Sequence, residues 1–91
     1  MIVADFRYIC KYINPMLMKQ IYDMSAENVR QFAYEYLRCG VTSRAVQCFE
    51  RLRWLGKLRQ QEYLLLSAMY LLLGRQDAVR KIINRYNTIY I

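Results

Sequence analysis

The sequence predicts an all-α fold of about six helices, arranged as stacked antiparallel helix pairs. Apolar residues recur at helical spacing along most of the chain, and no segment alternates for long with a period of two. Only three glycines and one proline punctuate these patterns. In addition, two segments in the second part of the chain share one pattern of residues, so that the second resembles a copy of the first.

Length and composition favour one small domain, residues 1–91, with more apolar surface than it can bury. The chain has 91 residues, and 56% of them are hydrophobic, against a typical 45–50% or so. Intrinsic disorder is therefore excluded as a description of the whole chain. Because a domain of this size buries only about 60–65% of its unfolded surface, we expect a partner or an oligomer to cover the surplus.

The charge and the cysteines constrain the environment. The net charge is +7, which fits an anionic partner or a well-solvated surface, and both interpretations stay open. Cys10, Cys39 and Cys48 form an odd set without framework spacing, so we expect reduced thiols. Asp5 and Arg7 interrupt the first apolar residues, so we expect no signal sequence. We therefore expect a cytoplasmic location.

Residues 1–25 are predicted to form a degenerate N-terminal helix pair. The first amphipathic helix covers residues 3–13. Asn14-Pro15 ends it, and Pro15 suits the first turn of a second helix. The apolar side of that second helix carries Leu17, Ile21 and Met24.

The third helix is expected from about Ala26 to Cys39. Ser25 is a candidate N-cap, and Glu27 suits the positive end of the helix dipole. Gly40 is typical of a helix C-terminus. The apolar face consists of Val29, Phe32, Ala33 and Tyr36.

The fourth helix is expected after a Thr42 or Ser43 cap, with Gly56 at its end. Its apolar stripe consists of Ala45, Cys48, Phe49 and Leu52. The sixth helix is expected to begin near Gln76 and to carry Ala78, Val79, Ile82, Ile83 and Tyr86. The conformation of residues 87–91 is left open.

The fifth predicted helix, residues 62–74, is apolar on every side. It falls short of the roughly 18–20 apolar residues that span a bilayer, so a membrane helix is rejected. A helix without a polar face must be covered on all sides. In the frame of the internal repeat described next, Leu66, Ser67 and Tyr70 face the core, and Leu64, Ala68, Leu71 and Leu72 lie on the opposite side.

An internal repeat appears when Gly40 is placed over Gly74. Tyr36 then falls on Tyr70, and Ala33 falls on Ser67. After the turn, Ala45 and Phe49 match Ala78 and Ile82 if the second copy lacks one turn residue. The predicted units are residues 26–59 and 60–91. The alternative is an ordinary six-helix bundle whose glycines happen to share this spacing.

The interval from Gly40 to Gly74 equals the roughly 34-residue period of the tetratricopeptide repeat, and the pattern resembles that family. The family's first small position corresponds to Ala33 or Ser67, and its aromatic position to Tyr36 or Tyr70. Its second small position corresponds to Ala45 or Ala78, and its large position to Phe49 or Ile82. The chain departs from the family in three ways, one of which is the turn residue missing from the second copy. The usual tryptophan is replaced by Val29 and Tyr63, and Lys57 stands where a proline usually closes the repeat.

The resemblance implies a curved array whose first helices line a concave groove. The residues placed there are Glu27, Arg30, Tyr34, Leu37 and Arg38, followed by Gln61, Leu64, Ala68, Leu71 and Leu72. Such an aliphatic groove suits an amphipathic partner helix. Alternatively, the N- or C-terminal helix folds back and covers the groove, and Ile82, Ile83, Ile89 and Ile91 are candidates for that role.

Among small tetratricopeptide-like proteins, the chain looks like the needle-subunit chaperones of bacterial type III secretion systems. The likeness implies a cytoplasmic heterotrimer. The groove would hold the amphipathic C-terminal helix of the needle subunit and prevent early polymerisation, and the basic rim of Arg30 and Arg38 would tune register and on-rate. A small helical co-chaperone would contact Ile2, Phe6, Ile9, Ile13 and Leu17.

Several chemistries have no candidate residues. The sequence contains no histidine, no paired carboxylates, no glycine-rich phosphate loop and no CxxC, so we expect no enzyme, no metal site and no cofactor. Two further binding functions remain as alternatives. One is self-assembly, in which a second copy fills the groove. The other is nucleic-acid binding, suggested by nine tyrosines and by the run Arg51, Arg53, Trp54, Lys57 and Arg59.

Overall fold

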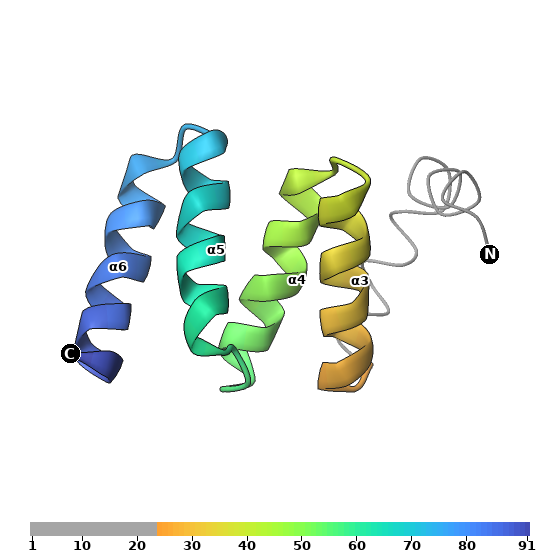
Figure 1. The fold of residues 1–91 in the computed structure, drawn as a ribbon, viewed down its shortest axis with the longest axis horizontal. Helices are drawn as coiled ribbons and strands as arrows, with labels where there is room; N and C mark the ends of the chain where they lie inside the picture. The colour runs from red at the N-terminus through yellow and green to blue at the C-terminus, as the bar shows by residue number, and fades with distance from the viewer. Residues whose placement is uncertain (1–23) are drawn as a thin grey trace.

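The computed structural model describes residues 24–91 as four α-helices, with no strand in that range: α3 (Ala26–Arg38), α4 (Thr42–Trp54), α5 (Gln60–Leu72) and α6 (Gln76–Tyr90). They stand side by side in chain order, and their directions alternate (Figure 1). The all-α prediction is confirmed for these residues. The two helices predicted before Ser25, and with them the proposed co-chaperone contacts, lie outside the described residues.

The four helices form two pairs. α3 packs against α4, and α5 packs against α6, whereas the contact between α4 and α5 is smaller. The second pair repeats the first at a fixed distance along the chain. The interval from the start of α3 at Ala26 to the start of α5 at Gln60 equals the interval from Thr42, where α4 begins, to Gln76, where α6 begins. The spacing of Gly40 and Gly74 in the sequence is therefore a spacing of helices.

The turn inside each pair has three residues and one geometry. Gly40 and Gly74 adopt φ values of 79° and 74°. Val41 N–H donates to Tyr36 O and Arg75 N–H donates to Tyr70 O, both at 2.9 Å, and this is the bond that closes a Schellman motif. The two turns have the same length because the same bond closes both.

The expected loss of one turn residue in the second copy is therefore wrong. When the helices are aligned by their first residues, Ala45 corresponds to Val79, and Phe49 corresponds to Ile83. The sequence pattern alone pairs these residues with Ala78 and Ile82, because Ala45 and Ala78 are identical. The structure shows that the two alanines differ, since Ala45 is fully buried whereas Ala78 is only half-buried.

Helix ends agree with the sequence in part. Ser25 caps α3 as expected, since its Oγ accepts a bond from Asn28 N–H at 3.3 Å. The N-cap of α4 is Val41, without a side-chain bond, so the expected cap at Thr42 or Ser43 is wrong by a residue. α6 continues to Tyr90, which settles the conformation of nearly all of residues 87–91.

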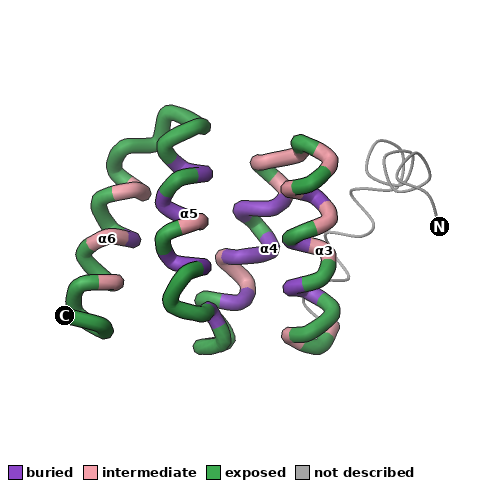
Figure 2. Tube along the Cα trace, in the orientation of Figure 1, coloured by how far each residue is buried: buried purple, intermediate pink, exposed green. Residues whose placement is uncertain are grey.

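The core lies between the helices of each pair and between the two pairs (Figure 2). Its fully buried large side chains include Tyr36, Phe49, Leu52, Leu66, Met69 and Ile82. α6 contributes only Ile82 to the buried set, because it is packed from one side at the end of the row. Residues 75–91 therefore expose most of their side chains.

The glycine turns provide a test of the local structure. Gly74→Ala is expected to lower the free energy of unfolding by about 1 kcal/mol, because a Cβ is strained at positive φ. Nothing lies within 4 Å of the added Cβ, so the cost is conformational and Gly74→Asn should recover part of it. Urea unfolding would measure both. Equal stability of the alanine variant and the parent chain would contradict the assigned turn.

Candidate functional site

The α5 helix has two distinct sides although residues 63–72 are almost all apolar. Its buried side includes Leu66, Ser67 and Tyr70, as the sequence predicted. The opposite side exposes an apolar stripe formed by Leu64, Ala68, Leu71 and Leu72. Leu71 is 60% exposed and Leu72 is 79% exposed, which is unusual for leucines on one small helix. The division into two sides is confirmed, and what the apolar stripe binds stays a prediction.

The other residues expected beside the stripe lie at equivalent positions on α3. The spacing between the helix pairs relates Tyr34 to Ala68 and Arg38 to Leu72. Tyr34 and Arg38 are exposed, and Leu37 is half-buried. Glu27 and Gln61 are exposed as well. Arg30 differs from all of these because its side chain is buried.

The C-terminal helix does not cover the apolar stripe. Tyr86 accepts a hydrogen bond from Gln60 Nε2 at 3.1 Å, and the Tyr90 ring contacts the Tyr63 ring at a centroid distance of 6.0 Å. These contacts hold α6 against another side of α5. Ile82 is buried within the α5–α6 pair, and Ile91 is 92% exposed, so the alternative in which the C-terminal isoleucines fill the groove is wrong.

A buried ion pair joins the two helix pairs. Arg30 of α3 donates from Nε to Glu62 Oε2 at 2.9 Å and from Nη2 to Glu62 Oε1 at 3.0 Å. Glu62, on α5, is 1% exposed. The two bonds form the bidentate arrangement in which a guanidinium and a carboxylate match best.

Two further groups complete the hydrogen bonding of this carboxylate. The Tyr34 hydroxyl donates to Glu62 Oε2 at 2.9 Å, and Arg59 N–H donates to Oε1 at 2.9 Å. The second bond caps the first turn of α5, which explains why the helix begins at Gln60 rather than at residue 62. Arg30 Nη2 also donates to Lys57 O, so the linker between the pairs is held by the same side chain.

The surroundings shift the acidity of the three side chains. Burial opposes the charge of Glu62, but the hydrogen bonds from Arg30, Arg59 and Tyr34, together with the Arg30 charge, outweigh it and lower the pKa of the carboxyl group. The bond to Glu62 raises the pKa of Arg30. Burial, followed by the bond to Glu62, raises the pKa of Tyr34. All three shifts favour a charged pair beside a neutral phenol.

Arg30 is thus not part of a solvated basic rim, and that expectation is wrong. Its partner was missed because Glu62 lies 32 residues away. One signal was available in the sequence: Glu62 is the only charged residue of α5 and stands at its third position, directly before a mostly apolar run. Arg38 does lie at the exposed surface, where it pairs with Glu35 on the same helix.

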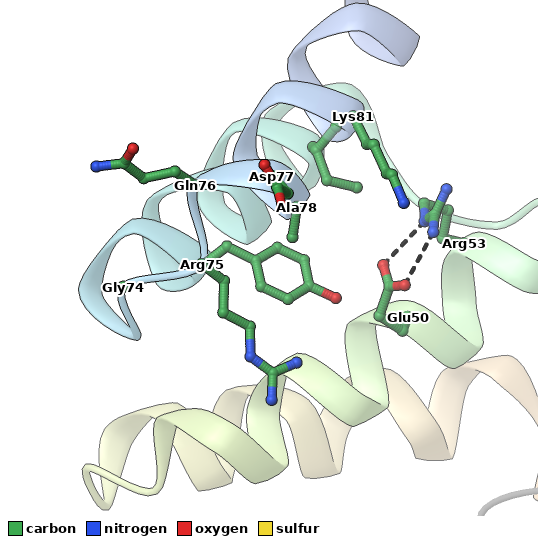
Figure 3. Close-up of a pocket in the computed structure, with 10 residues that line it drawn as sticks. Glu50, Arg53, Gly74, Arg75, Gln76, Asp77, Ala78 and Lys81 are labelled. Atoms are coloured by element: carbon green, nitrogen blue, oxygen red, sulfur yellow. Dashed lines mark hydrogen bonds and ion pairs between the residues drawn. The ribbon is translucent and has the colours of Figure 1, made fainter.

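Two pockets lie between α4 and α6, away from the apolar stripe. One, of about 590 Å³, includes the α5–α6 turn, and the other, of about 630 Å³, lies nearer the chain's end. Glu50 and Arg53 border both, and they form an ion pair with an Nε–Oε1 distance of 2.8 Å. Lys81 of α6 extends toward this pair across the pocket (Figure 3). Sequence reasoning named Arg53 and Trp54 but not these pockets.

Other chemistries have no geometric support in the described part of the chain. Within residues 24–91, no three metal-binding side chains come together. The helices described there are each too short, or too polar, to cross a bilayer. The apolar stripe and the Arg30–Glu62 pair are therefore the features on which a function is built.

Removal of one member of the buried ion pair tests how much the pair contributes to the stability of the fold. Glu62→Leu leaves the buried Arg30 with only the exposed Glu27 carboxylate, 3.6 Å from its Nη1, and should cost about 3–5 kcal/mol of unfolding free energy, a large share of the total for a small domain. The double variant Arg30→Met, Glu62→Leu should recover most of it, since no charge is left unpaired. Arg53→Met, on the more exposed Glu50 pair, is the control, expected within about 1 kcal/mol of the parent. An equally stable Glu62→Leu chain in urea unfolding would contradict this.

The lowered pKa of Glu62 also predicts a pH dependence. The stabilisation is complete above about pH 4.5, where an unfolded glutamate ionises, and is lost as the pH falls through the lower folded pKa. The stability gap between the parent and Glu62→Gln should therefore narrow on acidification, as measured by urea unfolding between pH 7 and pH 3. A gap that stays constant across this range would show that the carboxylate's charge is not stabilised in the fold.

Comparisons with protein-family models, with curated proteins and with solved structures give no match for this chain. A functional proposal must therefore start from the geometry of residues 24–91. That geometry consists of two helix pairs in fixed register, a buried ion pair between them and an exposed aliphatic stripe on α5.

Proposed function

We propose that this protein is a cytoplasmic chaperone that holds the amphipathic C-terminal helix of a type III secretion needle subunit. It would keep that subunit from polymerising early, acting together with a second small co-chaperone. The observation that carries the proposal is the apolar stripe of Leu64, Ala68, Leu71 and Leu72, which is exposed on a helix without a polar side.

The spacing of the stripe suits a helical ligand. Its residues lie at i, i+4, i+7 and i+8, which is the periodicity of one face of a helix. Helices that bind in grooves use anchors with the same spacing. Each leucine that becomes buried on binding contributes roughly 1.5–3 kcal/mol before ordering costs, so three of them can hold a partner that would otherwise aggregate.

The repeat architecture supports the needle-chaperone assignment. The equal intervals between helix starts and the matching glycine turns agree with a tetratricopeptide-like array, whose first helices face a concave surface. In that frame Tyr34 and Arg38 extend the surface from α3. The co-chaperone would bind the apolar residues Ile2, Phe6, Ile9, Ile13 and Leu17, which lie outside the described residues.

Nucleic-acid binding has weaker support. Trp54 is 82% exposed and could stack on a base. However, Arg53 beside it is engaged in two bonds with Glu50, at 2.8 and 2.9 Å, so part of the basic run is already neutralised. The apolar stripe, in contrast, stays exposed. The chaperone proposal is therefore favoured.

The test is co-expression with the small reading frames beside its gene, followed by co-purification. Leu71→Asp and Leu72→Asp should each abolish capture of the needle subunit, because a carboxylate would be buried on binding. Both positions are exposed, so the helical fold should survive, as circular dichroism would show. Leu64→Asp is expected to act in the same way.

Trp54→Asp is the matched control, since it removes an apolar side chain as exposed as Leu72 from α4. It should leave capture intact. Undiminished capture by the Leu71 and Leu72 variants would refute the assigned surface. Co-purifying nucleic acid that is released by salt and lost in the Trp54 variant would favour the alternative function.

A further inference from the structure

The two helix pairs present equivalent edges, and only one of them is occupied by a described helix. The edge formed by α3 and α4 receives α5. The corresponding edge of α5 and α6 lies at the end of the row, with no further described helix against it (Figure 1). The first edge therefore shows how a helix would bind to the second.

On α3, two side chains hold the following helix. Arg30 and Tyr34 both reach Glu62 of α5. On α4, Glu50 and Arg53 border the pockets on the side of the second pair. Val46 lies one turn before Glu50 and two turns before Arg53, and it is 6% exposed. Val46, Glu50 and Arg53 thus form the stripe of α4 that faces the second pair.

The equivalent residues of the second pair have different chemistry. Leu64 stands in the place of Arg30, and Ala68 in the place of Tyr34. On α6 the equivalents of Val46, Phe49, Glu50 and Arg53 are Arg80, Ile83, Asn84 and Asn87. Apart from Ile83, these α6 positions are polar, whereas the two α5 positions are aliphatic.

We propose that the edge formed by α5 and α6 is the docking site for one helix of a partner protein, which lies parallel to α5 in the place of a third pair's first helix. At the position that corresponds to Glu62 of α5, this helix has an aliphatic residue, which contacts Leu64 as Glu62 contacts Arg30. The inference rests on the proposed function for the claim that a second protein supplies the helix.

Charge indicates the rest of the partner's chemistry. Arg75, Lys81 and Arg85 border the pockets on the side of α4 and so do not face this edge. Arg80 lies on the docking edge itself. The partner helix therefore carries an acidic residue opposite Arg80, beside its aliphatic face.

A second copy of this chain fits the edge poorly. In a head-to-tail arrangement, α3 of the second copy would dock on the free edge as α5 docks on the edge of α3 and α4. Asn28 of that copy would then stand where Glu62 stands in the first contact. An amide would then lie on Leu64 without a partner, which is unfavourable. The net charge of +7 on each copy adds repulsion.

A covalently attached helix tests the site without knowledge of the partner. Residues 55–91 are repeated after Thr88, which is the equivalent of Trp54, so that a second α5 follows α6. Three extended chains are compared. The first keeps Glu62 in the added copy, the second carries Glu62→Leu there, and the third keeps that Glu62 and carries Leu64→Arg in the original α5.

Two adjacent single-cysteine substitutions report docking in each extended chain. Arg80→Cys places a thiol at the equivalent of Val46, which is buried when α5 is docked, and Lys81→Cys places one at the equivalent of Gln47, which stays exposed. Thiol-labelling rates at the two positions, resolved by mass spectrometry, give protection at the edge and its matched control. Circular dichroism checks that every chain is helical.

The expected result depends on whether residue 64 of the original α5 and residue 62 of the added copy are chemically complementary. Labelling of the Arg80→Cys thiol should fall at least about tenfold in the Glu62→Leu and Leu64→Arg chains relative to the 91-residue chain. It should fall much less in the chain where the added Glu62 meets Leu64, because a carboxylate would be buried without a cation. Labelling of the Lys81→Cys thiol should change less than about twofold throughout.

Three outcomes would overturn the inference. Equal protection in all three extended chains would show that the edge does not select an aliphatic contact. Protection in none would show that no helix docks there, whereas capture of the needle subunit could still succeed through Leu72 and its neighbours. Slower labelling of Arg80→Cys than of Lys81→Cys already in the unextended chain would show that the protein covers this edge itself.

Discussion

The Arg30–Glu62 ion pair is the interaction on which the arrangement of the two helix pairs depends. α4 and α5 make a smaller contact than the helices within each pair, so apolar packing alone holds the pairs together less firmly. The guanidinium bonds to the carboxylate and to Lys57 O, and therefore links α3, the linker and α5. Four hydrogen bonds to Glu62 offset the desolvation of its charge.

The same pair separates the two sides of α5. Because Glu62 directs one side of the helix toward α3, and Leu66 and Tyr70 fill the core, the side that carries Leu71 and Leu72 points away from both. A helix with a polar outer side would simply be soluble there. An aliphatic outer side costs solubility unless another surface covers it.

Local features were predictable from the sequence because neighbouring residues determine them. Gly40, Gly56 and Gly74 end helices through positive φ, and Ser25 caps α3 through a bond three residues along the chain. The two sides of α5 followed from the internal repeat, which aligns Ser67 and Tyr70 with Ala33 and Tyr36. The Arg30–Glu62 pair did not follow, since it joins residues 32 apart whose proximity depends on how the pairs stack. Ala45 and Ala78 are identical residues at non-equivalent positions, because the two turns have the same length and are closed by the same bond.

The most direct test of this account is native-state hydrogen exchange resolved by helix. If the ion pair couples the two pairs, the slowest amides of α3–α4 and of α5–α6 exchange with one common opening free energy. In Glu62→Gln the two values should separate, with the α5–α6 pair opening more readily because α6 is packed from one side only. Distinct opening free energies for the two pairs in the parent chain would contradict the claim that this ion pair joins them.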